Sequence, residues 1–317
     1  MACKKRDGTV HGWLVLDKPM HITSAKAVFA VREIFNATKA GHAGTLDPLA
    51  TGVLPIALGE ATKTVPYAMN STKDYNLTVR WGEATTTDDA DGEVIETSEL
   101  RPNIPDILEI IDRFIGIIEQ VPPNFSAIRI NGERAYKLAR SGKKVNLKRR
   151  LINIINLILV NVPNRDEANF QVTSGSGAYM RSLARNLAQS LGTVGHVRNL
   201  RRLRVGPFCI NNAITLNKID NPMKNIQPSN YLLPIETALK NMPSIALQKS
   251  QAAILRNGQA IPIHTLMDNL RLYNLHENDL IYVTNNRIPV AITRIKNGDI
   301  HPLKVLNFSD TLKTIKQ

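Results

Sequence analysis

Residues Gly41–Gly52, which read GHAGTLDPLATG, place a single aspartate among small side chains. Asp47 is followed by Pro48, and an Asp-Pro pair is by itself a common turn element. The glycines around Asp47 leave room for a flat ligand to approach the backbone closely, and the ring of His42 could stack on a base or hydrogen-bond to it. A lone carboxylate does not fit the paired acids of glycoside hydrolysis. It does fit a carboxylate nucleophile, which we predict at Asp47.

Other chemistries fail on the spacing of their motifs. The acidic run TTTDDADGE is similar to a calcium loop only superficially, because aligning Gly92 with that loop's glycine puts Thr87 and Ser98 at the two end ligand positions. The glycine-rich SGSGAYMRS lacks the Gly-Lys-Ser/Thr of a Walker phosphate loop. No HExxH or GxGxxG motif is present, and the histidines do not cluster as ligands. We therefore predict neither a metal nor a cofactor.

The charge of the chain indicates the kind of partner. Its 317 residues carry a net charge of +13, and the basic residues are spread over several clusters. Such clusters favour a polyanionic partner, with nucleic acid first and an anionic membrane second, although a solubilising surface is the plain alternative. The clusters are Lys4-Lys5-Arg6, Lys143-Lys144, Lys148-Arg149-Arg150 and Arg201-Arg202-Leu203-Arg204.

Cysteine use and hydrophobicity bear on the compartment. Only Cys3 and Cys209 are present, so no disulfide framework or CxxC metal knuckle can be built. The N-terminus MACKKRDG lacks the apolar run of a signal peptide. The most apolar stretch, Leu151–Val162, is too short and too rich in asparagine to span a bilayer, and its β-branched residues predict a buried strand. We expect a cytoplasmic protein without a membrane partner, and a monomer because no heptad pattern indicates a dimer.

The elements that must position Asp47 can be predicted from periodicity and end signals. GWLVLDKP is typical of a strand ended by Pro19, and it leads into a helix from Ala25 to Phe35 with Thr23 or Ser24 as its N-cap. The next predicted elements are a strand VLPIALG, a helix over Glu60 to Met69, a strand DYNLTVRWG and a hairpin turn at Asp91-Gly92.

Strands and helices alternate along the rest of the chain with short connections, which favours an α+β fold with a mainly antiparallel mixed sheet flanked by helices. The segment Pro122–Arg150 has a Pro-Pro break, a short strand, a small helix over Glu133 to Ser141 and a basic tail, and it could be a flap that closes over a ligand. We expect a domain boundary near Pro243. The remaining predicted elements are a helix from Pro105 to Phe114, a strand ANFQVTS, a helix from Ala178 to Leu191 and a C-terminal hairpin at Asn285-Asn286.

One long stretch, GHAGTLDPLATGVLPIALGEATK, resembles the catalytic motif of the TruB-type tRNA pseudouridine synthases. At Ala43 and Thr45 the stretch has small residues that differ from the small residues expected at these positions of the family motif. Further segments resemble that family in the family's own order across most of residues 10–210, which is more specific than any one motif. They are GWLVLDKP, KDYNLTVRWGEATTTDDADGE, VPPNFSAIRINGERAYKLARSG, SGSGAYMRSLARNLAQSLG and HVRNLRRLRVG.

The resemblance implies roles for particular residues. Asp47 would be the nucleophile that begins cleavage of the N-glycosidic bond, Tyr75 would stack on the target base and could move a proton, and Arg181 would pair with Asp47. An arginine beside an aspartate favours the ionised carboxylate. Without the motif, Tyr75 would read as a sheet-packing aromatic and Arg181 equally well as a helix-surface charge. The other implied substrate-binding residues are Asp89 in a charge network, His42 against the distorted T loop, Leu200 beside the flipped base, Lys18 with Pro19 in the pocket wall, and Tyr179.

The resemblance also implies the activity, which is isomerisation of uridine-55 in the T loop of tRNA to pseudouridine, with no cofactor. It implies a catalytic domain over residues 1–242 with an RNA-gripping insertion at about 122–150, and a small PUA-like RNA-binding domain over 243–317. Attack at the ribose C1′ and attack at the uracil C6 both stay open. The alternatives are a basic RNA chaperone, which could also coexist with the enzyme, and a related synthase that acts on another RNA or is guided by one.

Overall fold

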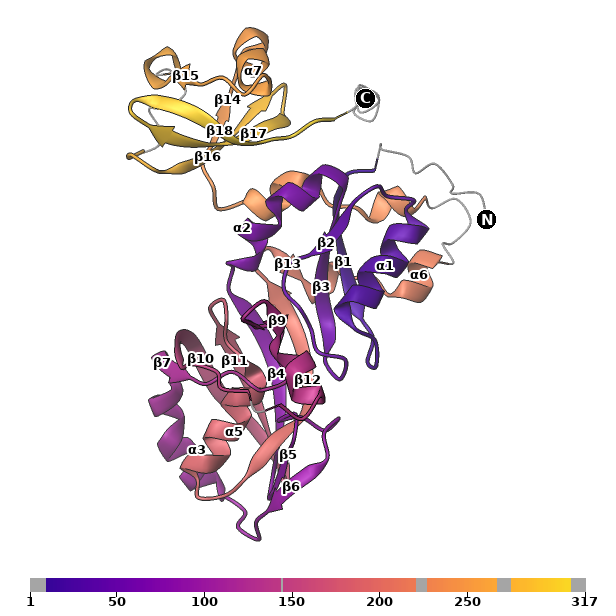
Figure 1. The fold of residues 1–317 in the computed structure, drawn as a ribbon, viewed down its shortest axis with the longest axis vertical. Helices are drawn as coiled ribbons and strands as arrows, with labels where there is room; N and C mark the ends of the chain where they lie inside the picture. Colours follow the sequence, from indigo (N-terminus) through magenta and orange to yellow (C-terminus); the bar gives the residue numbers. More distant parts are fainter. Residues whose placement is uncertain (1–9, 144, 221–226, 267–274, 309–317) are drawn as a thin grey trace.

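The computed structural model describes residues 10–143, 145–220, 227–266 and 275–308 of the chain (Figure 1). Three features noted in the sequence, namely Cys3, the basic cluster Lys4-Lys5-Arg6 and Lys144, lie outside the described residues. Two main sheets organise the described chain: a large one, and a smaller one formed by residues near the C-terminus.

The large sheet contains nine strands within the described residues, in the order β1-β3-β12-β4-β11-β10-β7, with β2 paired to β3 and β13 paired to β12. The β12–β3 pair is parallel and the other pairs are antiparallel. The predicted mainly antiparallel mixed sheet is therefore confirmed. Its strands are β1 (Gly12–Lys18), β2 (Ala40–His42), β3 (Thr51–Leu58), β4 (Lys73–Trp81), β7 (Gly116–Gln120), β10 (Arg150–Asn164), β11 (Glu167–Ser174), β12 (Gly195–Val205) and β13 (Phe208–Cys209).

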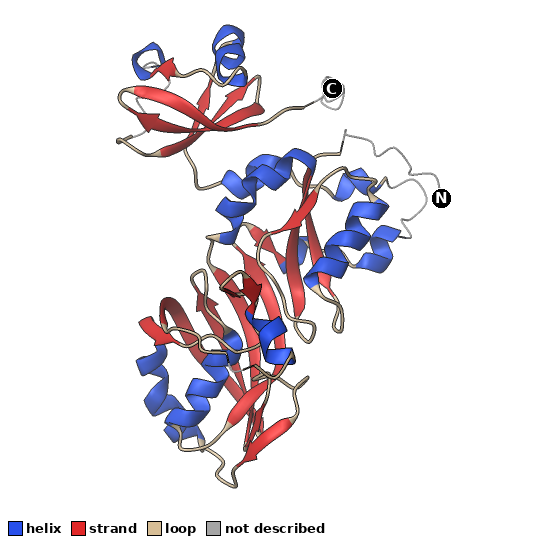
Figure 2. Cartoon of the chain, viewed as in Figure 1, coloured by secondary structure: helices blue, strands red, loops and turns tan. Residues whose placement is uncertain are grey.

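Helices flank this sheet (Figure 2) and share one hydrophobic cluster with its strands. In α1 (Ser24–Ile34), Ala27 and Val31 are fully buried, and the side chain of Thr23 accepts a hydrogen bond from the amide of Lys26, so Thr23 is the N-cap. α3 (Ile104–Ile111) and α5 (Met180–Ser190) contribute their buried apolar residues to the same cluster. Four short helices lie between β13 and the C-terminal sheet in the described part of the chain: η3 (Ile210–Asn212), α6 (Leu216–Asp220), η4 (Pro228–Tyr231) and η5 (Ile235–Leu239).

Two predicted helices contain a 3-10 turn. The helix predicted over Glu60 to Met69 is a 3-10 segment η1 (Gly59–Thr64) followed by α2 (Val65–Met69), and Pro66 stands in the first turn of α2. Proline has no amide hydrogen, so it cannot continue the ladder of the preceding turn. The other helix begins at Ile104, one residue before Pro105, and ends in η2 (Asp112–Phe114).

The acidic turn lies between two short strands, β5 (Glu83–Thr85) and β6 (Val94–Thr97), which pair with each other. Within the turn, the amide of Gly92 donates to the carbonyl of Asp89, and the amide of Thr86 donates to the carbonyl of Glu93. Asp89 also forms an isolated bridge with Val197 of β12. This bridge brings the turn to the large sheet.

The apolar stretch Leu151–Val162 forms most of β10, but the prediction that it is buried is wrong for one face. Ile152 and Ile154 are buried, whereas Leu151 is 70% exposed and Val160 is 54% exposed. The exposed and buried residues alternate over most of the strand, as on an antiparallel sheet with one face in contact with water.

The segment 122–150 holds the predicted small helix, which begins at Ala135 and not at Glu133, and two short strands where one was predicted. β8 (Arg129–Ile130) pairs with β9 (Glu133–Arg134), and α4 (Ala135–Arg140) follows directly. The helix is attached to the preceding loop by hydrogen bonds from the amides of Ala135 and Tyr136 to the carbonyls of Ile128 and Ser126.

A five-stranded sheet with its own hydrophobic cluster forms the C-terminal β-rich domain. The predicted hairpin is confirmed, with its turn one residue later than the predicted Asn285-Asn286: β16 and β17 are joined through Asn286 and Arg287, which have φ values of 49° and 62°. Positive φ at both turn residues matches the twist of antiparallel strands. The elements are β14 (Ser244–Ala246), α7 (Lys249–Arg256), β15 (Ile261–Pro262), η6 (Ile263–Leu266), β16 (Leu280–Asn285), β17 (Ile288–Lys296) and β18 (Asp299–Val305).

The chain after β18 returns to the large sheet. Leu306 is 2% exposed and belongs to a cluster with Trp13 and Phe208. The carboxylate of Glu60 accepts hydrogen bonds of 2.6 Å from both the ammonium of Lys63 and the amide of Asn307. These contacts attach the end of the C-terminal sheet to the 3-10 turn η1.

Candidate active site

The loop that carries Asp47 connects β2 to β3 and is fixed from two sides. The hydroxyl of Ser24, at the start of α1, accepts a hydrogen bond of 2.8 Å from the amide of Leu46 and donates one of 2.9 Å to the carbonyl of the same residue. On the far side of the proline, the amide of Ala50 donates to the carbonyl of Asp47. The Asp47 side chain is 35% exposed. The loop therefore presents a carboxylate that a ligand can reach.

Arg181 holds this carboxylate. Its side chain, on the first turn of α5, is 5% exposed; its Nη2 donates to Oδ1 of Asp47 over 3.1 Å, and its Nε lies 2.9 Å from Oδ2 in an ion pair. The guanidinium also donates to the carbonyls of Thr87 and Phe125, over 2.9 and 3.0 Å. Three separate segments of the chain therefore set the orientation of one guanidinium.

Asp89 is the second acid near Arg181. Its Oδ2 lies 3.7 Å from Nε of Arg181, and its Oδ1 accepts hydrogen bonds from the hydroxyl of Thr87 and the amide of Asp91. Burial raises the pKa of Asp89, and the Thr87 hydroxyl and the Arg181 guanidinium act in the opposite direction. The structure thus brings together the three predicted members of the charge network, Asp47, Arg181 and Asp89.

Tyr75 is 7% exposed on β4, where its cross-strand partners are Val172 and Arg202. Burial raises the pKa of the Tyr75 phenol, while the adjacent guanidinium of Arg202 lowers it and the charge of Asp47 raises it further. The phenol therefore lies within electrostatic reach of the loop carboxylate. Tyr75 and Asp47 come from different elements, and the sheet places them at one site.

Arg202 is a residue of this site that sequence reasoning missed. It was counted with its neighbours in a basic cluster, but it is 1% exposed, while Arg201 pairs with Asp17 and Arg204 with Asp74. These three arginines of the cluster therefore have their donors directed at the protein itself. The alternation of side chains along a strand was the available signal for Arg202. Arg202 comes two positions after the predicted site residue Leu200, so the two side chains lie on the same face of β12.

Lys18 supports the loop from beneath. Its side chain is fully buried, and its ammonium donates to the carbonyls of Pro19, Ile22 and Pro48 over 2.8, 2.9 and 3.3 Å. Burial lowers the pKa of Lys18 to about 8. Because Pro48 follows Asp47 directly, Lys18 connects the end of β1 to the peptide that carries the acid.

The three remaining predicted residues lie around the same site. His42 is half-buried at the end of β2, and burial lowers its pKa with a further contribution from the charge of Arg202. Tyr179 precedes α5, and both its amide and its carbonyl are hydrogen-bonded to the side chain of Gln120. Burial raises the pKa of its phenol. Leu200 is 8% exposed and belongs to the same hydrophobic cluster as Tyr75.

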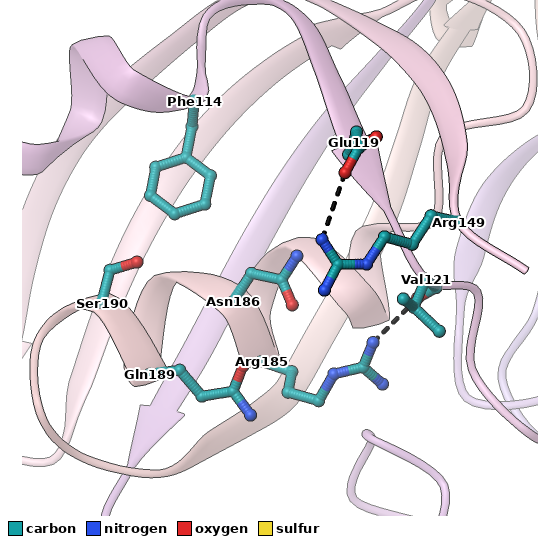
Figure 3. Close-up of a pocket in the computed structure, with 8 residues that line it drawn as sticks. All are labelled: Phe114, Glu119, Val121, Arg149, Arg185, Asn186, Gln189 and Ser190. Carbon is teal, nitrogen blue, oxygen red and sulfur yellow. Dashed lines mark hydrogen bonds and ion pairs between the residues drawn. The ribbon is translucent and has the colours of Figure 1, made fainter.

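A hollow of about 620 Å³ lies beside α5 but does not hold these groups (Figure 3). Arg185, one turn after Arg181, points into it and also pairs with Asp88. Since Asp47, Tyr75 and Arg181 are absent from the lining, we do not assign the chemistry to this hollow. It is lined by Phe114, Glu119, Val121, Arg149, Arg185, Asn186, Gln189 and Ser190.

Two further observations concern ligands. Among the residues that the structure describes, no group of three His, Cys, Asp or Glu side chains is placed to hold a metal ion. Within the same residues, no helix has the length and apolarity needed to cross a bilayer. The absence of a cofactor, expected from the sequence, stays a prediction.

Comparison with family models identifies the chain. Residues 32–180 match the N-terminal domain of the TruB family pseudouridylate synthases, and residues 181–240 match the C-terminal domain of tRNA pseudouridylate synthase B. The chain belongs to the TruB family. The resemblance inferred from the loop around Asp47 and its companion motifs is confirmed.

Curated TruB relatives match over almost the whole chain. The tRNA pseudouridine synthase B of Rhodospirillum rubrum is 47% identical, with 97% of this chain and 100% of the relative covered. The proteins of the same name from Caulobacter vibrioides and Ehrlichia canis are each 44% identical, over 98% and 94% of this chain and 100% and 98% of the relatives.

Solved structures share the TruB fold. One, an H/ACA RNP bound to a substrate RNA containing 2′-deoxyuridine, aligns with a TM-score of 0.70 at 22% identity over 93% of this chain and 85% of the other. A Cbf5-Nop10-Gar1 complex gives the same score and coverages at 24% identity. At this level of identity the likeness concerns the fold, and it confirms the pseudouridine synthase fold predicted from the sequence.

Proposed function

We propose that this member of the TruB family isomerises uridine-55 in the T loop of tRNA to pseudouridine. The observation that carries the proposal is the Asp47 carboxylate, 35% exposed and held by a guanidinium that is itself 5% exposed. A partly exposed carboxylate that is fixed by a buried guanidinium is oriented for reaction with a ligand that arrives from solvent. Binding alone does not need such a nucleophile.

The reaction begins when the target base leaves its stack, at a cost of a few kcal/mol. Asp47 attacks either C1′ of the ribose or C6 of the uracil; both routes remain open. The bond between the glycosidic nitrogen and C1′ breaks, the uracil rotates, C5 bonds to C1′, and the bond to Asp47 breaks, which frees the carboxylate. Tyr75 accepts the proton that C5 loses, and the freed ring nitrogen takes up a proton from water. Uracil and ribose keep all their other atoms, so the step needs no redox partner.

Residues around Asp47 have supporting roles in this proposal. Arg181 and Asp89 orient the nucleophile, and Tyr179 and Leu200 contact the flipped nucleotide. His42 supports the rearranged T loop. Lys18, with three carbonyl acceptors, keeps the loop at the end of β1.

We assign RNA binding to the positive charge of the protein and to two parts of the chain. The net charge of +13 favours a polyanion, and its phosphate contacts offset the cost of unstacking the base. The insertion at about 122–150 grips the T arm. Residues 243–317 form a PUA-like RNA-binding domain, which is attached to the catalytic domain, residues 1–242, by the contacts of Glu60 and Leu306. The protein acts as a cytoplasmic monomer.

Site mapping on an unmodified tRNA transcript tests this proposal. After incubation with the protein, carbodiimide treatment and primer extension should give one new stop, one nucleotide 3′ of position 55. A transcript with cytidine at position 55 is the matched control and should give none. A T-arm stem-loop should serve as substrate without any added guide RNA. Modification only at another position, or only with a guide RNA, would point to the alternative synthase. Binding without any modification would leave only the RNA chaperone.

A further inference from the structure

The guanidinium of Arg202 is a buried charge without an acidic partner among the described residues. Its side chain is 1% exposed, its guanidinium donates to backbone carbonyls, and the charge of Asp47 acts on it without forming an ion pair. Taking an ionised group out of water is costly unless a counter-charge compensates it. Arg201 and Arg204, beside it on β12, are both paired to aspartates. The unpaired charge of Arg202 therefore indicates a functional role at this position.

Arg202 fixes the loop of Asp47 on both of its sides. Its Nη2 and Nη1 donate to the carbonyls of Gly44 and Thr45 over 2.9 and 3.2 Å, and its Nε donates to the carbonyl of Val53 over 2.8 Å. Gly44 and Thr45 precede Asp47, and Val53 follows it. One guanidinium therefore attaches the first half of the loop to strand β3, which follows it.

Arg202 is also the cross-strand partner of Tyr75 on β4, and its guanidinium lowers the pKa of the Tyr75 phenol against the effect of burial. The other charges that act on Tyr75 are the carboxylates of Asp47 and Asp74, and both favour the neutral phenol. Close to Arg202 lie three further basic side chains, Lys18, His42 and Lys73, each of which has a pKa lowered by burial and by the Arg202 charge.

We propose that Arg202 is a positioning residue for Tyr75, one that holds the phenol oxygen beside the Asp47 loop and supplies the positive charge that stabilises the phenolate. The inference rests on the proposed function. In the step concerned, the Tyr75 phenolate oxygen takes the proton from C5 of the rearranged uracil. The electron pair of the C5–H bond returns to the ring, and the phenol so formed releases its proton to water before the next turnover.

Ionisation of Tyr75 can be followed without RNA, so this test does not depend on turnover. The protein is labelled with [¹³Cζ]tyrosine, and the Tyr75 resonance is assigned by its loss in Tyr75→Phe. In Arg202→Gln, which keeps hydrogen-bond donors but no charge, the titration midpoint should rise by about 1–3 pH units relative to wild type, the size of effect that an adjacent opposite charge has. Arg202→Lys, which keeps the charge on a shorter side chain, should give a smaller rise.

Arg201→Gln is the matched control, because Arg201 is the adjacent arginine and points to Asp17 on the other face of the strand. It should leave the Tyr75 midpoint unchanged. An unchanged midpoint in Arg202→Gln would overturn the inference. If Arg202→Gln does not fold, Arg202→Lys decides, and an unchanged midpoint there would overturn it as well.

A kinetic arm separates an electrostatic role from simple support of the loop. Single-turnover release of tritium from C5 is followed against pH. In Arg202→Gln the rising limb of the pH–rate profile should move to higher pH. A fluorinated tyrosine of lower phenol pKa at position 75 should then raise the rate of the variant at neutral pH at least tenfold. A lower rate with an unmoved limb and no rescue would mean that Arg202 only supports the loop. Failure of the proposed function looks different, because wild type itself would then release no label.

Discussion

Gly52 and Arg202 are partners in the parallel ladder between β3 and β12, and no side chain fits on the glycine. A Cβ on Gly52 would lie 2.2 Å from the carbonyl oxygen of Arg202 and 2.9 Å from its amide nitrogen, and Gly52 has a φ of 98°. Both contacts are backbone atoms, which cannot move aside as a flexible side chain can. The position after the Asp47 loop therefore requires glycine for contact and for conformation.

Gly52→Ala should destabilise the fold strongly. A positive φ costs about 1–3 kcal/mol in a residue with a side chain, and overpacking adds about 1–3 kcal/mol. Gly116→Ala is a matched control, because Gly116 has a φ of 96° and nothing within 4 Å of the added carbon. Urea unfolding measures both variants. Equal losses in the free energy of unfolding would contradict the contact described here.

Arg181→Lys should reduce turnover while leaving tRNA binding largely intact. The variant keeps a positive charge but loses the planar fork that reaches Asp47, Thr87 and Phe125 together. Loss of one charged hydrogen bond costs about 1.5–3 kcal/mol, and each 1.36 kcal/mol on the barrier is about tenfold in rate, so we expect a fall of about 10–100-fold. Arg185→Lys, one turn later on α5, is the control. A larger fall in Arg185→Lys would show that Arg181 has been given the wrong role.

Lys73 predicts a pH dependence of stability. Burial lowers its pKa to about 8 from 10.5, so the folded state disfavours the ammonium and the unfolded chain binds more protons between these two values. Lys73 therefore makes the free energy of unfolding increase as pH rises from about 8 to 10.5, with a slope of up to about 1.36 kcal/mol per pH unit.

In Lys73→Met this contribution is absent, so the stability of the variant relative to wild type should be greatest below pH 8 and should decline up to pH 10.5. Urea unfolding at a series of pH values measures it. Lys26→Met, at an exposed position on α1, should change the slope little. Parallel curves of unfolding free energy against pH for wild type and Lys73→Met would show that burial does not lower the pKa of Lys73.

Leu306 should couple the C-terminal sheet to the catalytic domain. It is 2% exposed in the cluster with Trp13, so Leu306→Ala removes a buried side chain at a cost of about 2–5 kcal/mol. Protease cleavage near residues 240–243 should become faster and tRNA affinity should fall. The comparison is Leu303→Ala, whose leucine is 40% exposed. If both variants were cleaved at the wild-type rate, Leu306 would not hold the domain in place.

Much of this architecture follows from local signals in the sequence. Thr23 caps α1, β11 alternates, and the turn at Asn286 takes the positive φ that a tight hairpin needs. The loop of Asp47 was found from its small residues and its companion motifs. Such features are visible because their causes lie within a few residues of each other.

What could not be predicted depends on partners far apart in sequence. Strand alternation puts Arg202 on the same face as Leu200, but only the pairing of β12 with β3 places its side chain under the loop. In β10, Leu151 reads as core, yet the strand has one face exposed. The hydrogen bond between Asn307 and Glu60 joins positions 247 residues apart, and no local sequence pattern indicates it.

The central claim is that Asp47 acts as the nucleophile on a uridine of tRNA, and tritium release tests it most directly. Wild type, Asp47→Asn and the surface control Asp91→Asn are incubated with tRNA labelled at C5 of uracil, and label entering water is counted beside tRNA binding. Wild type and Asp91→Asn should release close to one label for each target uridine. Asp47→Asn should bind the tRNA and release none. Release at the wild-type rate by Asp47→Asn would contradict the account.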